Sequence, residues 1–173
     1  MKSFLEKVDE YIYSFLINNV ENMPVRFIKV IANYYPDARI RKLYFERLGI
    51  KMGDNTFANL GMKIVVCQNT QEPQVIIGNN VSIAPNVVFI AESGANNGNI
   101  INSLKYVKER LTVSDKIIVE DEVWIGANVT ILPGIIIGKC SIIGAGSVVT
   151  KNVDPFSIYA GVPAKKIRSL DKS

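Results

Sequence analysis

The sequence predicts an all-β fold, a left-handed parallel β-helix, that follows an α-helical segment at the N-terminus. Two observations lead to this prediction: an apolar residue recurs at every sixth position, and the chain is apolar enough to build one sizeable core. The 173 residues are 48% hydrophobic, which suits a single domain. A period of six fits neither an isolated amphipathic helix, with a period of about 3.6, nor an alternating strand, with a period of about two.

The six-residue repeat contains two in-phase sets of residues. The first set is Ile77, Ile83, Phe89, Val119, Ile125, Ile131, Ile137, Ile143 and Val149. The second set lies two residues earlier and comprises Val75, Val81, Val87, Ile117, Val123, Val129, Ile135, Ser141 and Ser147. A short strand and a turn, repeated around a triangular prism, produce this period, with one aliphatic residue per face pointing inward and stacked about 4.8 Å from the next. A β-sandwich with apolar runs is the alternative, and the constant phase disfavours it.

Residues 1–49 are predicted to form an N-terminal helical cap. Apolar residues recur at helical spacing between Phe4 and Leu16, and two further apolar segments follow, with Pro24 and Pro36 as punctuation and Gly49 as the end. These apolar stripes favour a cap that packs on or beside the prism over a helix that lies on a membrane surface.

Residues 50–153 are predicted to form the β-helix, with a protruding loop at 92–116. The loop begins rich in Gly and Asn and then becomes basic, with a possible helix from Leu104 to Leu111. Phe89 and Val119 on its two sides differ by 30 positions, five times six, so the inward phase is kept across it. Loops of this length are usually functional or disordered, and we expect this one to serve a function, within reach of a neighbouring subunit. Residues 154–173 follow as a tail.

Composition excludes several classes of function. The net charge is +4, and the basic stretches carry no aromatic and basic RNA-binding motif, so no nucleic-acid partner is expected. No apolar run reaches the roughly 20 residues of a membrane span, and residues 1–19 carry too many charges for a signal peptide. Cys67 and Cys140 are read as reduced, unclustered core thiols, which predicts a cytoplasmic location and no metal site.

Four motifs then indicate a family. They are V-W-I-G at 123–126, A-N-V-T-I-L-P-G at 127–134, G-A-G-S-V-V-T-K at 144–151 and A-G-V-P-A-K-K-I-R at 160–168. Together they resemble the hexapeptide-repeat acetyltransferase family, the galactoside, maltose, xenobiotic and polysaccharide O-acetyltransferases, over about residues 50–170. Residues 41–53 resemble the lead-in of the polysaccharide enzymes. The resemblance implies a homotrimer that holds acetyl-CoA in the cleft between two adjacent prisms.

The resemblance also assigns a donor site. Trp124 falls on the family's tryptophan near the acceptor and the pantetheine end, and Gly126 and Ala127 fall on the backbone that meets the thioester. The Ala127 N–H is the implied oxyanion donor. The other implied contacts run along coenzyme A to its phosphates, with residues 154–173 as a CoA-binding tail, and are Ala145, Thr150, Lys151, Lys165, Lys166 and Arg168.

Two asparagines are the expected substrate-binding residues. Asn59, in T-F-A-N at 56–59, matches an acceptor-binding asparagine of the galactoside enzymes. Asn86 lies in I-A-P-N-V at 83–87, the segment that precedes the catalytic histidine in the family.

The chain departs from the family because it contains no histidine. The position of the catalytic histidine falls on Glu92 or Gly94, according to the relative used, and Glu92 is the candidate base. Losing a general base costs about 10²–10⁴ in rate, and a carboxylate is a weak base at neutral pH. The expected function is acetyl transfer to a hydroxyl of a sugar or polysaccharide precursor. N-acetylation of an amino sugar or amine and a catalytically silent trimeric scaffold stay open, whereas a γ-class carbonic anhydrase, which needs histidine ligands, is excluded.

Overall fold

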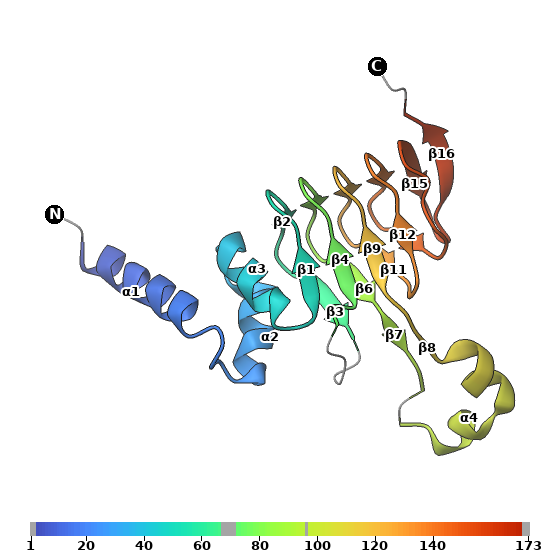
Figure 1. Cartoon of the computed structure of the whole chain (residues 1–173), viewed down its shortest axis with the longest axis horizontal. Coiled ribbons are helices and arrows are strands. Elements are labelled where there is room, and N and C mark those ends of the chain that lie inside the picture. Colours follow the sequence, from blue (N-terminus) through green and yellow to red (C-terminus); the bar gives the residue numbers. More distant parts are fainter. Residues whose placement is uncertain (1–2, 67–71, 96, 171–173) are drawn as a thin grey trace.

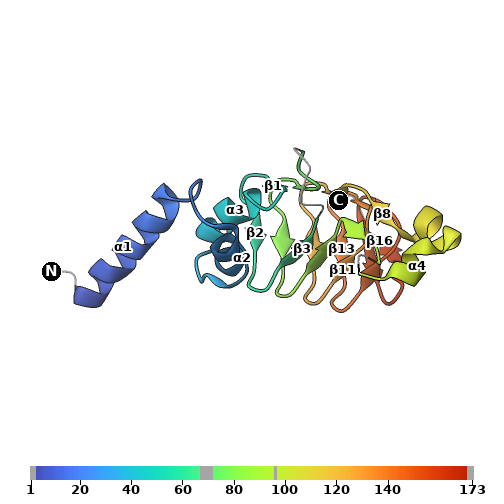
Figure 2. The same ribbon diagram turned by 90° about the horizontal axis from the view of Figure 1, so that it is seen from below.

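A computed structural model describes residues 3–66, 72–95 and 97–170 of the chain, and Cys67 lies outside them. Three helices come first: α1 (Phe4–Asn18), α2 (Val25–Tyr34) and α3 (Ala38–Glu46). A prism of short parallel strands follows, and α1 extends away from one end of it (Figures 1 and 2). Helices α2 and α3 stand at that end, beside the first coil (Figure 1).

The prism has three faces, and the chain visits them in the order A, B, C. Face A consists of β1 (Ile50–Met52), β4 (Val75–Ile77), β9 (Ile117–Val119) and β12 (Ile136–Ile137). Face B consists of β2 (Phe57–Ala58), β5 (Ser82–Ile83), β10 (Trp124–Ile125), β13 (Ile142–Ile143), β15 (Ser157–Ala160) and β16 (Lys165–Ser169). Face C consists of β3 (Lys63–Val65), β6 (Val88–Ile90), β11 (Thr130–Ile131) and β14 (Val148–Val149). The prediction of a parallel β-helix is therefore confirmed.

The core of the prism is formed by both in-phase sets of the repeat. Every residue of the first set is at most 2% exposed, and every residue of the second set at most 6%. Equivalent positions stack in register, as Ile83, Ile125 and Ile143 do on face B. The expectation of one inward residue per face was too low, because each short strand places two inward residues around a single outward one.

Two serines of the second set are accommodated in the core because each hydroxyl is hydrogen-bonded, and the Ser147 hydroxyl also accepts from the Gly161 N–H of the next coil at 3.1 Å. The buried Ser141 hydroxyl donates to the Gly138 carbonyl at 2.6 Å, and the Ser147 hydroxyl donates to the Gly144 carbonyl at 2.6 Å. A buried hydroxyl costs little once it is hydrogen-bonded within its own turn. The six-residue phase therefore continues through positions that are not apolar.

The description all-β was too simple. Besides α1–α3, the chain forms α4 (Asn99–Ser103) and a π-helical turn, η1 (Val107–Leu111), within an arm. The arm leaves the prism through the antiparallel pair β7 (Glu92–Ser93) and β8 (Val113–Ser114) (Figure 1). The Ala91 carbonyl accepts from the Asp115 N–H at 2.9 Å, which closes the base of the arm and keeps the phase of the coils.

Arg41 joins the helical segment to the first coil. This side chain is 2% exposed and donates to the carbonyls of Tyr35, Pro36 and Ala58, each at 2.6 Å. Burial lowers the pKa of its guanidinium, although the group still uses its donors on three carbonyls. The cap and the prism are thus held together by a buried cation as well as by apolar packing.

Candidate functional site

The predicted donor residues divide into separate groups on the prism. One group follows the corner between faces B and C, one coil after another, and comprises Asn59, Asn86, Gly126, Ala127 and Ala145. Backbone hydrogen bonds connect the coils along this corner, from the Asn86 N–H to the Leu60 carbonyl at 3.0 Å and from the Gly146 N–H to the Ala127 carbonyl at 2.8 Å. The corner is therefore a continuous ridge of backbone rather than a closed pocket.

Trp124 lies next to this corner, on the outer surface of face B. Its neighbours in register are Ser82 on the preceding coil and Ile142 on the following one. The indole is 57% exposed, whereas Val123 and Ile125 on either side of it are buried. The core of the prism does not hold this large aromatic side chain, which is therefore available to a molecule outside its own prism.

Gly126 marks the closest approach of two coils beside Trp124. A Cβ atom at this position would lie 2.6 Å from the Ala145 nitrogen and 2.9 Å from its Cα. Only glycine fits there, and its N–H donates to the Ile143 carbonyl at 2.8 Å.

The next residue, Ala127, presents its backbone at the corner surface. The Ala127 carbonyl accepts from Gly146, but in the part of the chain that the structure describes its N–H donates to no other group. An unused, half-exposed N–H is what the stabilisation of an oxyanion requires.

The two asparagines differ in what their side chains do. The Asn59 Oδ1 accepts from the Leu60 N–H at 2.8 Å, a local turn contact that orients the half-buried side chain at the end of β2. Asn86 has a φ of 60° and is exposed. Asparagine is tolerated in this left-handed region better than most residues, so a turn explains Asn86 without a substrate.

The second group lies at another corner of the prism, between faces C and A. Thr150 and Lys151 follow β14 there and are exposed, and Glu92 begins β7 at the same corner and is half-buried. Because this corner lies opposite face B, a single prism does not bring Glu92 to Trp124. Any site that uses both residues takes them from two different prisms.

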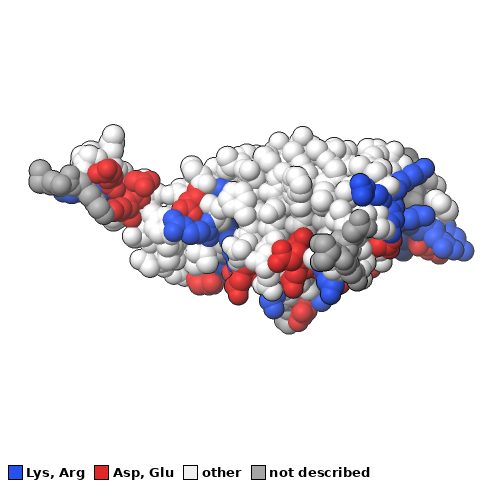
Figure 3. Space-filling view, turned by 90° about the horizontal axis from the view of Figure 1, so that it is seen from above, with Lys and Arg blue, Asp and Glu red and all other residues white. Residues whose placement is uncertain are grey.

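The cations of the last strand form the third group. Lys165 pairs in register with Ala160, and Lys166 pairs with Tyr159, so the two lysine side chains point to opposite sides of the β15–β16 hairpin. The Lys166 ammonium contacts Asp154 at 2.9 Å, and this hydrogen bond, followed by one from Tyr159, lowers the pKa of the Asp154 carboxyl. Arg168 is exposed on the same strand, and Lys and Arg gather at this end of the molecule (Figure 3).

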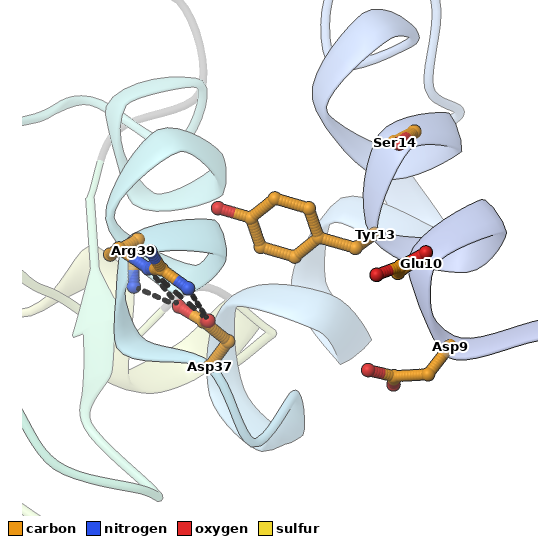
Figure 4. Close-up of a pocket in the computed structure, with 6 residues that line it drawn as sticks. All are labelled: Asp9, Glu10, Tyr13, Ser14, Asp37 and Arg39. Carbon is orange, nitrogen blue, oxygen red and sulfur yellow. Dashed lines mark hydrogen bonds and ion pairs between the residues drawn. The ribbon is translucent and has the colours of Figure 1, made fainter. Parts of the chain in front are cut away.

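A hollow lies at the other end of the molecule, and none of the sequence motifs predicted it. It has a volume of about 360 Å³ and is lined by Asp9, Glu10, Tyr13, Ser14, Asp37 and Arg39 (Figure 4). None of the predicted donor residues lines it. Arg39 is already engaged, because it pairs with Asp37 at 2.6 Å and lies over the Tyr13 ring at 5.3 Å.

Neither a metal-binding cluster nor a membrane-spanning helix occurs among the described residues. No group of three or more His, Cys, Asp or Glu side chains is placed to hold a metal ion there. None of the helices in that part of the chain is long and apolar enough to cross a membrane.

Comparison with known proteins identifies the family. Residues 116–151 match the family described as bacterial transferase hexapeptide (six repeats). The chain is 38% identical over 122 residues to the galactoside O-acetyltransferase of Escherichia coli K12, a match that covers 70% of this chain and 55% of that protein. It therefore spans about half the length of the curated relatives it matches.

Solved structures agree with the fold. A hexapeptide-repeat-containing acetyltransferase of Vibrio cholerae superposes with a TM-score of 0.66 at 29% identity, over 86% of this chain and 89% of that one. The same Vibrio protein is also known complexed with acetyl coenzyme A. A galactoside acetyltransferase in complex with coenzyme A superposes with a TM-score of 0.65 at 27% identity, over 90% of this chain and 82% of that one. Left-handed parallel β-helices with N-terminal helices are the fold of these neighbours, and the repeat together with these relatives supports the hexapeptide-repeat acetyltransferase family for this chain.

Proposed function

We propose that the protein transfers an acetyl group from acetyl-CoA to a hydroxyl of a sugar or polysaccharide precursor. The observation that carries the proposal is the exposed Trp124 beside the Gly126–Ala127 corner, on a prism whose relatives include galactoside O-acetyltransferases. Coenzyme A lies along the ridge between faces B and C. There the exposed peptide groups of successive coils meet the pantetheine amides, and the indole of Trp124 borders the acetyl end.

The phosphates of the donor lie towards the C-terminal end of the ridge. Lys165 and Arg168 are the cations proposed to neutralise them, because Lys166 is already paired with Asp154. Lys151 and Thr150, at the other corner, belong to the wall that the adjacent chain supplies. This division refines the sequence prediction, in which all of these residues were expected to follow one ligand.

The site is proposed to form between adjacent chains of a homotrimer. Glu92 and Trp124 lie on opposite sides of one prism, and a second prism whose C–A corner is set against face B brings its own Glu92 to the Trp124 of the first. Each pair of neighbours then builds one site, and the arm of one chain covers the acceptor bound on the next. Three chains in a ring complete three equivalent sites.

Glu92 is proposed to act as the base in direct transfer. The acceptor oxygen attacks the thioester carbonyl carbon, its proton passes to the Glu92 carboxylate, and the oxyanion is held by the Ala127 N–H. The C–S bond then breaks, the acetyl ester forms, and the CoA thiolate leaves and takes up a proton. Cleavage needs no metal in this scheme.

Because the chain contains no histidine, two alternatives to O-acetylation stay open. An amine acceptor is nucleophilic without a strong base, so N-acetylation of an amino sugar places less demand on Glu92. A trimer that binds its ligand without turnover would need no base at all. Transfer to a hydroxyl ranks first because two relatives, 38% and 31% identical over 70% and 72% of this chain, are named as galactoside O-acetyltransferases. Such an enzyme acts in the cytoplasm, on precursors of polysaccharide biosynthesis.

Calorimetric titration with acetyl-CoA tests the donor half of this proposal. Saturable binding is expected, with affinity lost in Lys165→Ala/Arg168→Ala and weakened in Trp124→Ala, while Lys63→Ala, an exposed cation on the first coil, binds as the wild type does. Acceptor screening by release of free thiol then separates sugars from amino sugars. If coenzyme A fails to bind at millimolar concentration, the scaffold replaces the enzyme as the leading function.

A further inference from the structure

Two backbone hydrogen bonds are repeated from coil to coil along the corner between faces B and C. The carbonyl that ends each face-B strand accepts from the preceding coil: Ile83 from Asn59 at 2.9 Å, Ile125 from Ala84 at 2.9 Å and Ile143 from Gly126 at 2.8 Å. Three residues further on, an N–H donates to the preceding coil: Asn86 to Leu60 at 3.0 Å, Asn128 to Pro85 at 3.0 Å and Gly146 to Ala127 at 2.8 Å. Strand β2 is the edge strand of face B, so the Ala58 carbonyl and the Gly61 N–H have no preceding coil to bond.

The helical cap supplies both missing partners. The Arg41 Nη2 donates to the Ala58 carbonyl at 2.6 Å, and the Gly61 N–H donates to the Asn33 carbonyl, in α2, at 3.0 Å. Helices α2 and α3 stand beside the first coil (Figure 1), and the hydrogen bond from Arg41 is buried there. The cap thus takes the place of a coil at this corner.

Arg41 is anchored at its other side to the turn between α2 and α3. Its Nη1 donates to the carbonyls of Tyr35 and Pro36, each at 2.6 Å. Hydrogen bonds from a charged group are stronger than those between neutral groups, and the planar guanidinium fixes the directions of its donors. Arg41 therefore holds the end of β2 rigidly relative to the cap.

Asn59, the predicted acceptor-binding residue, lies between the two groups that the cap holds. Its Oδ1 accepts from the Leu60 N–H at 2.8 Å, so its side chain follows the backbone of this short segment. The register of face B puts the small residues Ala84, Gly126 and Gly144 at the same position on the next coils. At about 4.8 Å per coil, Asn59 stands roughly 10 Å from Gly126 and is the residue of this row with a hydrogen-bonding side chain.

We propose that Arg41 is a positioning residue of the acceptor site, which fixes Asn59 relative to the Gly126–Ala127 corner by holding the Ala58 carbonyl. Arg41 is 2% exposed, so it acts through the backbone of β2 rather than by touching a substrate. A misplacement of about 1 Å in a positioning group costs about 10²-fold in rate. This role rests on the proposed function, in which Asn59 contacts the sugar acceptor.

A double-mutant cycle with p-nitrophenyl β-galactoside as the acceptor tests whether Arg41 acts through Asn59. Arg41→Lys keeps the charge but loses the planar fork, and it should lower kcat/KM for the acceptor about tenfold or more, with acetyl-CoA affinity unchanged. With Asn59→Ala already in place, Arg41→Lys should cause no further loss. Equal losses in both backgrounds would overturn the proposal.

Tyr44→Phe is the matched control within the cap. It removes the buried hydrogen bond from the Tyr44 hydroxyl to the Leu16 carbonyl, which does not involve β2. The melting temperature should fall, and kcat/KM for the acceptor should stay unchanged. A loss of acceptor kcat/KM equal to that of Arg41→Lys would mean that any weakening of the cap has this effect, and it would overturn the specific role of Arg41.

Amide hydrogen exchange gives a readout that needs no substrate. In Arg41→Lys, the N–H groups of Asn59 and Gly61 should exchange about tenfold faster or more relative to those of Ala84 and Gly126 on later coils. Arg41→Gln, with a neutral donor, should show the same selectivity if the lysine variant does not fold. Equal acceleration at all four positions would mean that Arg41 only stabilises the fold, and it would overturn the proposal. Selective exchange in a protein that acetylates no sugar in the acceptor screen would uphold the restraint on Asn59 and refute the proposed function instead.

Discussion

At Gly126 the backbone of the next coil comes so near that a Cβ atom would lie 2.6 Å from the Ala145 nitrogen. The contact lies beside Trp124, so the same residue sets both the spacing of two coils and the position of the exposed indole. Backbone cannot retreat in the way that a flexible side-chain tip can. A substitution here therefore strains two coils rather than one side chain.

Gly126→Ala is accordingly expected to destabilise the protein by about 1–3 kcal/mol, the usual range for overpacking a rigid site. Urea unfolding followed by circular dichroism measures the change. Asn128→Gly is the matched control, because it keeps the left-handed φ of 58° and the N–H that donates to Pro85 in the same corner. A Gly126→Ala protein as stable as the wild type would mean that the coils separate at little cost.

Glu92→Gln tests the proposed base at the residue scale. If the carboxylate accepts the acceptor's proton, turnover should fall at least about tenfold and acetyl-CoA affinity should stay unchanged, since the amide has similar size but does not take the proton. Glu46→Gln, an exposed position at the end of α3, is the control and should leave turnover unaltered. An unchanged rate in Glu92→Gln would leave catalysis to the positioning of the substrates alone.

Among the elements, α3 shows how a local signal supports the cap. Asp37 precedes the helix, and its carboxylate accepts from the Arg39 N–H at 2.8 Å, as an N-cap residue does. The Arg39 guanidinium also donates to it, and this hydrogen bond is the main reason that the pKa of Asp37 is lowered to about 2 from its ordinary value of 3.8. Helix α3 therefore begins at Asp37, whose carboxylate is both its N-cap and the ion-pair partner of Arg39.

The pH dependence of stability follows from the direction of that shift. A carboxyl with a lowered folded pKa stabilises the protein fully above pH 3.8, and the contribution is lost as the pH falls towards about 2. Asp37→Asn, which keeps a capping oxygen, should remove this acid-dependent part. Asp37→Ala should also lose the cap, at about 0.5–2 kcal/mol. Melting temperatures of the three proteins between pH 2 and pH 6 measure both effects, and identical acid profiles would contradict the ion-pair contribution.

For the whole molecule, the prism separates residues that the proposed chemistry needs together. Trp124 lies on face B and Glu92 at the corner opposite to it, so the proposed reaction would need an assembly in which one chain faces another. Assembly is thus proposed to serve the chemistry at the prism.

Complementation between two inactive variants tests the shared site. Trimers formed from equal amounts of Glu92→Gln and Trp124→Ala chains should regain activity, because about one site in four then draws both native residues from different chains. Co-expression and a thiol-release assay measure the recovery, and each variant alone provides the baseline. Mixed trimers as inactive as either parent would place both residues of a working site in one chain, or neither of them in it.

The sequence by itself determined the coil and its inward residues. The six-residue phase requires no contact at long range to be seen, because each strand and turn repeats locally, and all of its predicted inward positions are buried. The motifs around Trp124 and Lys165 indicated the family because each is a short contiguous segment that can be recognised without long-range contacts. Two inward residues per face, instead of one, could have been found from the second in-phase set.

Only the tertiary structure decided where those residues stand relative to one another. Closing the prism sends Glu92 and Trp124 to opposite sides, and pairing β16 with β15 turns Lys165 and Lys166 away from each other. The periodicity of the sequence also cannot predict that α1 projects from the body with its apolar side chains exposed, or that a hollow lies beside it. Each depends on the angle between elements, which is set by contacts such as those of Arg41 and Tyr44 between residues distant in sequence.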